Sequence, residues 1–172
     1  MKELPKRKDI RLKKYDYSQS GAYFITICTK NRENLFWTKN DDNASQLPVV
    51  GATCGRPLKN IRYSNCACFV ENEIRKIPEI YNGTVIVDKY VIMPDHLHMI
   101  IFLKNIGRPQ VAPTISRVIK QFKGTLSKKA GFSVWQKSFI DRVIRDDNEY
   151  QKIWKYIDEN PYKLYDKLNG NL

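Results

Sequence analysis

The sequence predicts an α+β domain in which helices pack on a central antiparallel sheet. The chain has 172 residues, the length of one domain with one sizeable core. Segments rich in β-branched and aromatic residues alternate along it with segments whose apolar residues recur at the helical period. We therefore expect a single domain over residues 1–172.

The first predicted strand spans residues 22–29. It is dense in β-branched and aromatic residues, which favour strands. Successive side chains of a strand point to opposite faces, and here both sets are largely apolar. That pattern is typical of a strand in the middle of a sheet.

A hairpin is predicted over residues 84–103. Residues 84–92 and 96–103 are both apolar and rich in β-branched side chains. Met93-Pro94-Asp95 is a short connection, so the second of these strands should return antiparallel beside the first.

Two helices are predicted on either side of this hairpin. Residues 69–80 have the helical period, with Pro78 expected to break the last turn and Asn82-Gly83 to end the helix. Residues 114–129 predict a basic helix with one apolar stripe.

The last predicted helix begins at Asp146, where Asp146 and Glu149 have the spacing of a capping box. We expect it to end at Asn160, because the residue before a proline disfavours helix. Tyr156 and Asn160 are four residues apart and so share one helix face. The helix would present a phenol and a carboxamide side by side.

Two segments have no regular pattern. Residues 1–20 form a basic N-terminal arm, read as a tail or as a segment that lies along a nucleic-acid backbone. Residues 38–62 contain polar residues, glycines and prolines, and predict an irregular surface insertion.

The charge balance indicates a polyanionic partner. Thirty Lys and Arg stand against eighteen Asp and Glu, a net charge of +12. Such a field attracts phosphate backbones. The amino terminus has no apolar signal core and no run of 18 apolar residues occurs, so we expect a cytoplasmic protein with no membrane partner.

Both histidines of the chain, His96 and His98, lie at the start of the predicted strand 96–103. Two residues apart on a strand, their imidazoles project from one face. They could converge on one cation or one phosphate, or could simply be two half-exposed histidines on a strand. The three-residue pattern alone does not decide between these readings.

Three motifs in this order resemble the single-tyrosine HUH transposases, and more narrowly the REP-associated tyrosine transposases. They are M-P-D-H-L-H at 93–98, W-Q-x-x-F-x-D-x-x-I-R at 135–145 and Y-I-D-E-N-P at 156–161. Residues 15–18 and 21–29 also look like that branch. The resemblance covers nearly the whole chain except 38–62 and the end after Pro161.

The resemblance implies a ferredoxin-like HUH nuclease fold with the histidine strand in its centre. It implies that His96, His98 and Asn160 bind a divalent metal and that Tyr156 is the nucleophile. The implied activity is cleavage and transfer of single-stranded DNA at a palindromic hairpin through a 5′-phosphotyrosine link. A carboxamide ligand and an oxygen-rich substrate favour Mg²⁺ or Mn²⁺ over zinc.

Further side chains are candidates for DNA contact. On the basic helix 114–129 they are Arg117, Lys120 and Lys123, which could instead form a solvated charged face. In the second motif and the segment that it spans they are Gln136, Arg142 and Arg145, and a structural role is open for Gln136 and Arg145.

Alternatives remain at this point. Tyr156 could be a core aromatic, Asn160 a plain helix-terminal residue, and Asp95 a turn residue or a ligand. The protein could be a hairpin nucleic-acid-binding protein without catalysis, or an HUH replication initiator or relaxase. Both a monomer and a homodimer are compatible with the sequence.

Overall fold

The computed structural model describes residues 19–39, 48–50, 57–104 and 113–170. Its elements follow the chain in this order: β1 (Gly21–Cys28), the 3-10 turn η1 (Lys30–Arg32), β2 (Trp37–Lys39), β3 (Ile61–Tyr63), α1 (Asn65–Ile80), β4 (Val85–Met93), β5 (His96–Leu103), α2 (Ile115–Ala130), β6 (Ile140–Ile144) and α3 (Asp147–Leu168).

Four strands form the main sheet in the order β4-β5-β1-β6, and every neighbouring pair is antiparallel. Leaving out the small β2–β3 pair and α3, the elements follow the β-α-β-β-α-β pattern of a ferredoxin-like fold. The predicted α+β fold class is confirmed, and the histidine strand β5 is indeed central.

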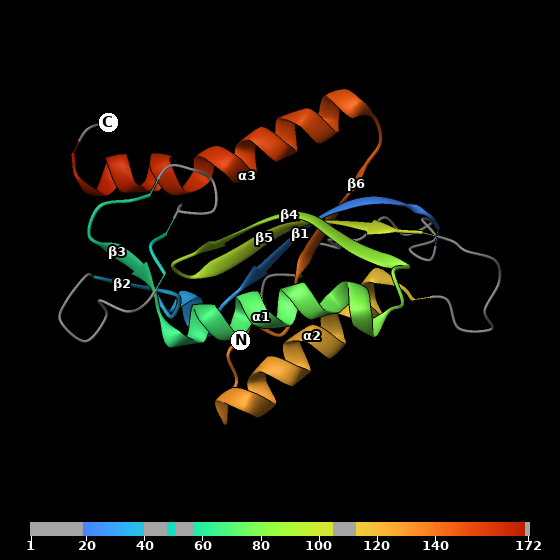
Figure 1. Cartoon of the computed structure of the whole chain (residues 1–172), viewed down its shortest axis with the longest axis horizontal. Helices are drawn as coiled ribbons and strands as arrows, with labels where there is room; N and C mark the ends of the chain where they lie inside the picture. The colour runs from blue at the N-terminus through green and yellow to red at the C-terminus, as the bar shows by residue number, and fades with distance from the viewer. Residues whose placement is uncertain (1–18, 40–47, 51–56, 105–112, 171–172) are drawn as a thin grey trace, which may run out of the picture.

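Helices cover both faces of this sheet (Figure 1). α1 and α2 lie on one face and α3 crosses the other. The larger apolar cluster includes residues of β1, β5, α1 and α2, such as Ile25, Met99, Ile74 and Ile119, all 0–1% exposed. A smaller cluster lies on the α3 face and consists of Val91, Met93, Ile100, Ile144, Ile153 and Ile157.

The predicted hairpin and basic helix are both present. β4 and β5 are joined by Pro94 and Asp95 alone. α2 begins after Thr114, whose hydroxyl accepts a hydrogen bond from the backbone N–H of Arg117. It ends at Gly131, whose φ of 76° lies in the left-handed region that favours glycine.

The prediction that the last helix ends at Asn160 is wrong, because α3 continues through Pro161 to Leu168. An internal proline removes one helix hydrogen bond and costs about 3 kcal/mol. Pro161 itself is buried, and Tyr162 and Tyr165 pack against the larger cluster. Burial of Pro161 and partial burial of the two tyrosines offset this cost, since burying apolar surface contributes about 25 cal/mol per Å².

α1 begins four residues earlier than predicted. Ser64 caps it by accepting a hydrogen bond from the N–H of Ala67. The prediction that Pro78 breaks the last turn is wrong, because the helix continues through Pro78 to Ile80. As predicted, Asn82 and Gly83 then turn the chain with positive φ angles of 47° and 73°.

The prediction of an irregular insertion over 38–62 is only partly right. β2 and β3 pair antiparallel, and Val50 and Leu58 are buried in the larger cluster. Aromatic and β-branched residues at the edges of the segment form this ribbon. Residues 40–47 and 51–56, and all but Gln19 and Ser20 of the predicted arm, lie outside the described residues.

None of the helices that the structure describes is long and apolar enough to cross a membrane.

Candidate active site

The histidine pair lies on the face of the sheet that α3 covers. In the β1–β5 pairing, Thr26 is opposite His98 and Cys28 is opposite His96. Alternation sends these residues toward α3, whereas Leu97 and Met99 enter the larger cluster on the other face.

Tyr156 on α3 meets this pair. Its hydroxyl lies 3.2 Å from Nε2 of His98, and Nε2 of His96 lies 3.1 Å from the same nitrogen. Phe24 stacks on the His98 ring with centroids 5.2 Å apart and meets the Tyr156 ring edge-on at 6.1 Å. The phenol and both imidazoles, predicted to act together, are thus in contact.

Burial favours the neutral form of both imidazoles. Burial lowers the pKa of His98 to about 3, and the nearby His96 and Arg32 add to the shift. Burial also lowers the pKa of His96, although the Asp95 carboxylate opposes that effect. A neutral imidazole keeps a lone pair on one ring nitrogen, which is the form that binds metals.

A second layer of polar side chains orients these rings. Oδ1 of Asp95 lies 2.5 Å from Nδ1 of His96, and Oδ2 lies 2.9 Å from Nε of Arg32. Because the carboxylate accepts from Nδ1, the lone pair of His96 is on Nε2. The hydroxyl of Thr26 forms a hydrogen bond with Nδ1 of His98 at 2.8 Å. The other ring nitrogen of His98, Nε2, therefore points toward His96 and Tyr156.

Arg32, which binds Asp95, lies in a segment with an uncommon backbone conformation. Asn31 and Arg32 have φ angles of 56° and 60°, in the left-handed region that non-glycine residues rarely adopt. Sequence reasoning missed Arg32 and Thr26, since neither lies near the histidines in the chain. Asp95 was considered as a turn residue or a ligand, and adjacency to His96 was the one signal of its actual contact.

The two Nε2 atoms of the histidine pair are close enough together for both to bind one metal ion. They lie 3.1 Å apart, a separation that metal–ligand distances of about 2.1 Å allow. Among the described residues no group of three His, Cys, Asp or Glu side chains could hold a metal.

Asn160 is on α3, the helix that carries Tyr156. It lies one helical turn after Tyr156 and is half-buried. No hydrogen bond joins it to either histidine in the part of the chain that the structure describes. Its predicted role as a metal ligand stays a prediction.

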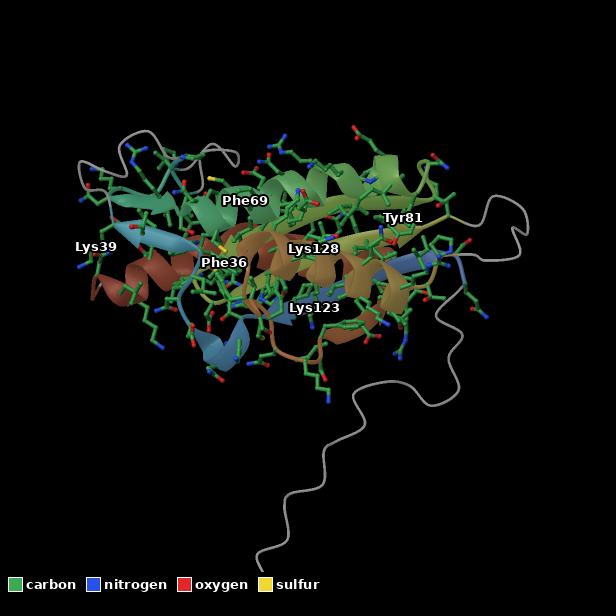
Figure 2. The ribbon with its side chains drawn as sticks, turned by 90° about the horizontal axis from the view of Figure 1, so that it is seen from below. Phe36, Lys39, Phe69, Tyr81, Lys123 and Lys128 are labelled. Carbon is green, nitrogen blue, oxygen red and sulfur yellow. The ribbon has the colours of Figure 1, made fainter. Side chains whose placement is uncertain are left out.

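The predicted DNA contacts of α2 are not gathered around the histidines. Arg117 and Lys120 are exposed on α2, on the opposite side of the sheet from α3. Figure 2 shows Lys123 and Lys128 on this helix. The ammonium of Lys123 donates to the carbonyls of residues 136, 137 and 138 at 2.5, 3.2 and 3.2 Å. These bonds give Lys123 a structural role in holding that loop to α2.

The candidates of the second motif fall in two places. The backbone carbonyl of Gln136 is one of those that Lys123 binds. Arg142 and Arg145 are exposed on or next to β6, where Arg142 forms an ion pair with Glu149 of α3. Glu149 also accepts from the backbone N–H of Arg145 at 2.9 Å. Contact of these residues with DNA stays a prediction.

The chain is similar in sequence to a known protein and in fold to a solved structure. No family model matches the chain. An uncharacterized protein of Haemophilus influenzae is 31% identical over 176 residues, covering 90% of this chain and 88% of that protein. Among solved structures, the chain is similar to the REP-associated tyrosine transposase bound to a REP hairpin. The TM-score is 0.56 at 19% identity, covering 89% of this chain and 73% of that one. The chain therefore belongs to one family with the Haemophilus influenzae protein and shares the fold of the REP-associated tyrosine transposase.

Proposed function

We propose that the protein is a metal-dependent, transposase-like enzyme that cuts and transfers single-stranded DNA through Tyr156. The observation that carries this proposal is the position of the Tyr156 hydroxyl, 3.2 Å from Nε2 of His98 and beside His96. This position puts a nucleophile beside two side chains that can bind a metal, an arrangement suited to metal-assisted attack on a phosphate. A core tyrosine has no need of either, and Tyr156 is 45% exposed.

Mg²⁺ or Mn²⁺, bound by His96, His98 and Asn160, would polarise the scissile phosphate. The Tyr156 oxygen attacks phosphorus, the bond from phosphorus to the 3′ oxygen breaks, and the 5′ phosphate stays on the tyrosine. The phenolic proton leaves to water, because the side chain is exposed. The 3′ oxygen takes a proton from water and becomes a free hydroxyl. Reversal of the same step joins the held 5′ end to another 3′ hydroxyl.

Hairpin DNA is the proposed substrate. The net charge of +12 favours a polyanion. The structural neighbour is bound to a REP hairpin, and its fold is the one found here. A short DNA hairpin with a single-stranded flank is therefore the substrate class to test.

The test is adduct formation. Single-stranded hairpin oligonucleotides from the DNA beside the gene are incubated with the protein and Mn²⁺ or EDTA, then run on a denaturing gel. We expect a metal-dependent protein–DNA adduct that disappears in Tyr156→Phe and persists in Tyr165→Phe, the matched change further along α3. Hairpin binding without cleavage in all metals would instead indicate a binding protein, and cleavage without an adduct would indicate a water nucleophile.

A further inference from the structure

β4 contains one extra residue, and as a result the side chains of both Asp88 and Lys89 point toward α3, the helix that carries Tyr156. Val87 pairs with Ile101 and Lys89 pairs with Ile100, so Asp88 is an additional residue on the β4 side of the ladder. Such a bulge changes which face the next residues point to. In a regular strand, Asp88 and Lys89 would project to opposite faces.

Here both side chains contact α3. The hydroxyl of Tyr150 donates to Oδ2 of Asp88 at 2.6 Å, and Nζ of Lys89 donates to Oδ1 of Asp158 at 2.7 Å. The residues on either side, Val87 and Tyr90, pack against the larger cluster on the other face. The bulge thus supplies two consecutive polar contacts to one helix.

On α3 the contacted residues form one stripe. Tyr150, Trp154 and Asp158 are spaced four apart, and Nζ of Lys89 also lies 3.7 Å from the centre of the Trp154 ring. Lys89 therefore binds α3 at two successive turns. We call Asp88, Lys89 and this stripe the β4 clamp.

The ion pair between Lys89 and Asp158 is largely shielded from solvent. The side chains of Lys89 and Asp158 are only 16% and 21% exposed, so their ion pair is less screened than a surface pair. In the smaller cluster, α3 contributes the buried apolar side chains of Ile153 and Ile157. Apolar contacts are not directional, whereas hydrogen bonds fix both distance and angle.

The contacts of Tyr156 with His98 and Phe24 depend on where α3 holds its side chain. Tyr156 is 45% exposed, and its position at His98 depends on how α3 is turned. One residue of rotation is about 100°, and one residue of sliding is about 1.5 Å. Either would take the hydroxyl out of hydrogen-bond reach of His98.

We propose that Asp88 and Lys89 are positioning residues, which set the rotation and axial position of α3 and so hold the Tyr156 hydroxyl at the histidine pair. This inference rests on the proposed role of Tyr156 as nucleophile. Neither residue touches the reacting atoms, so their effect is on geometry and not on substrate affinity.

Lys89→Met tests the inference because it keeps most of the apolar stem and removes the ammonium. Three quantities are measured: the rate of adduct formation at saturating hairpin DNA, the dissociation constant for that DNA, and the thermal unfolding midpoint. Lys163→Met is the matched control, since it removes another ion pair of α3, with Glu159, away from the sheet. We expect the rate to fall about 10- to 100-fold in Lys89→Met with the dissociation constant unchanged within about twofold. The control should keep the wild-type rate.

A charge exchange separates positioning from loss of folding. Lys89→Asp combined with Asp158→Lys should recover part of the rate that either single change removes. A rate in Lys89→Met equal to wild type would overturn the inference, and so would equal losses in Lys89→Met and Lys163→Met.

A readout that needs no activity distinguishes this inference from the proposed function. In metal-free protein, nuclear Overhauser contacts between the rings of Tyr156 and His98 report the helix position; these rings are 5.3 Å apart between centroids. We expect these contacts in wild type and Lys163→Met and their loss in Lys89→Met. Contacts that persist in Lys89→Met would overturn the inference, whereas an inactive wild type that shows the contacts would count against the proposed function alone.

Discussion

The two faces of the main sheet are formed by the same strands but have different roles: one packs the larger apolar cluster, and the other carries the histidine pair. Toward α1 and α2, β1 and β5 present apolar side chains such as Ile25 and Met99, both fully buried. Toward α3, the same strands present Thr26, His96 and His98. Because successive side chains of a strand point to opposite faces, residues of the larger apolar cluster alternate along β1 and β5 with residues of the candidate active site. A change at one position should therefore affect mainly one of the two.

The largest expected effect is on the chemical face. His96→Ala should abolish Mn²⁺ binding and lower adduct formation by about 10³-fold or more, because a metal contributes several kcal/mol to such a step. The thermal unfolding midpoint in EDTA should change little, since the ring is half-buried and outside both apolar clusters. Calorimetry with Mn²⁺ and denaturing gels measure these quantities, and metal-dependent cleavage at the wild-type rate would contradict the proposed site.

The next effect is on the apolar face. Ile74→Ala should lower the free energy of unfolding by about 2–5 kcal/mol, because Ile74 is 1% exposed in the larger cluster. Ile153→Ala, in the smaller cluster and 8% exposed, should cost less. Urea denaturation in EDTA measures both. Equal losses of unfolding free energy in the two variants would contradict the expectation that the larger cluster contributes more to stability than the smaller one.

A smaller effect concerns the second layer of the site. Asp95→Asn should weaken Mn²⁺ affinity about 10- to 100-fold, because a carboxylate that orients a metal-binding imidazole raises its basicity. Calorimetric titration measures the affinity, with Asp166→Asn on α3 as the matched control. Unchanged affinity in Asp95→Asn would leave Asp95 as a turn residue only.

The smallest effect is a pH dependence on the apolar side. Hydrogen bonds from Lys129 and Lys76 hold the pKa of Glu73 below its usual value. A carboxylate whose pKa is lower in the folded state stabilises the fold above its unfolded pKa of about 4.3, and this contribution is lost as the pH falls through the folded value.

Glu73→Gln should therefore cost about 1 kcal/mol of unfolding free energy at pH 7 and progressively less below about pH 4. Urea denaturation across this pH range measures the difference between the two proteins. A difference that does not shrink in acid would show that the ion pairs of Glu73 are not its source.

Several properties follow from local sequence alone. Alternation of apolar residues located β1 and β5 and put both histidines on one face, and the four-residue spacing of Tyr156 and Asn160 put them on one side of a helix. Thr114 and Gly131 mark the ends of α2 by capping chemistry that acts within a few residues. These features depend on strand and helix periods, which need no knowledge of the rest of the fold.

Other properties were decided by packing between distant segments. α3 continues through Pro161 because burial of its last turns outweighs the local cost of proline. Arg32 meets Asp95, and Lys89 meets Asp158, across 63 and 69 positions of the chain. The bulge at Asp88 lies in the pairing of β4 with β5. Periods and caps are local, whereas these contacts form only when the sheet brings its strands and α3 together.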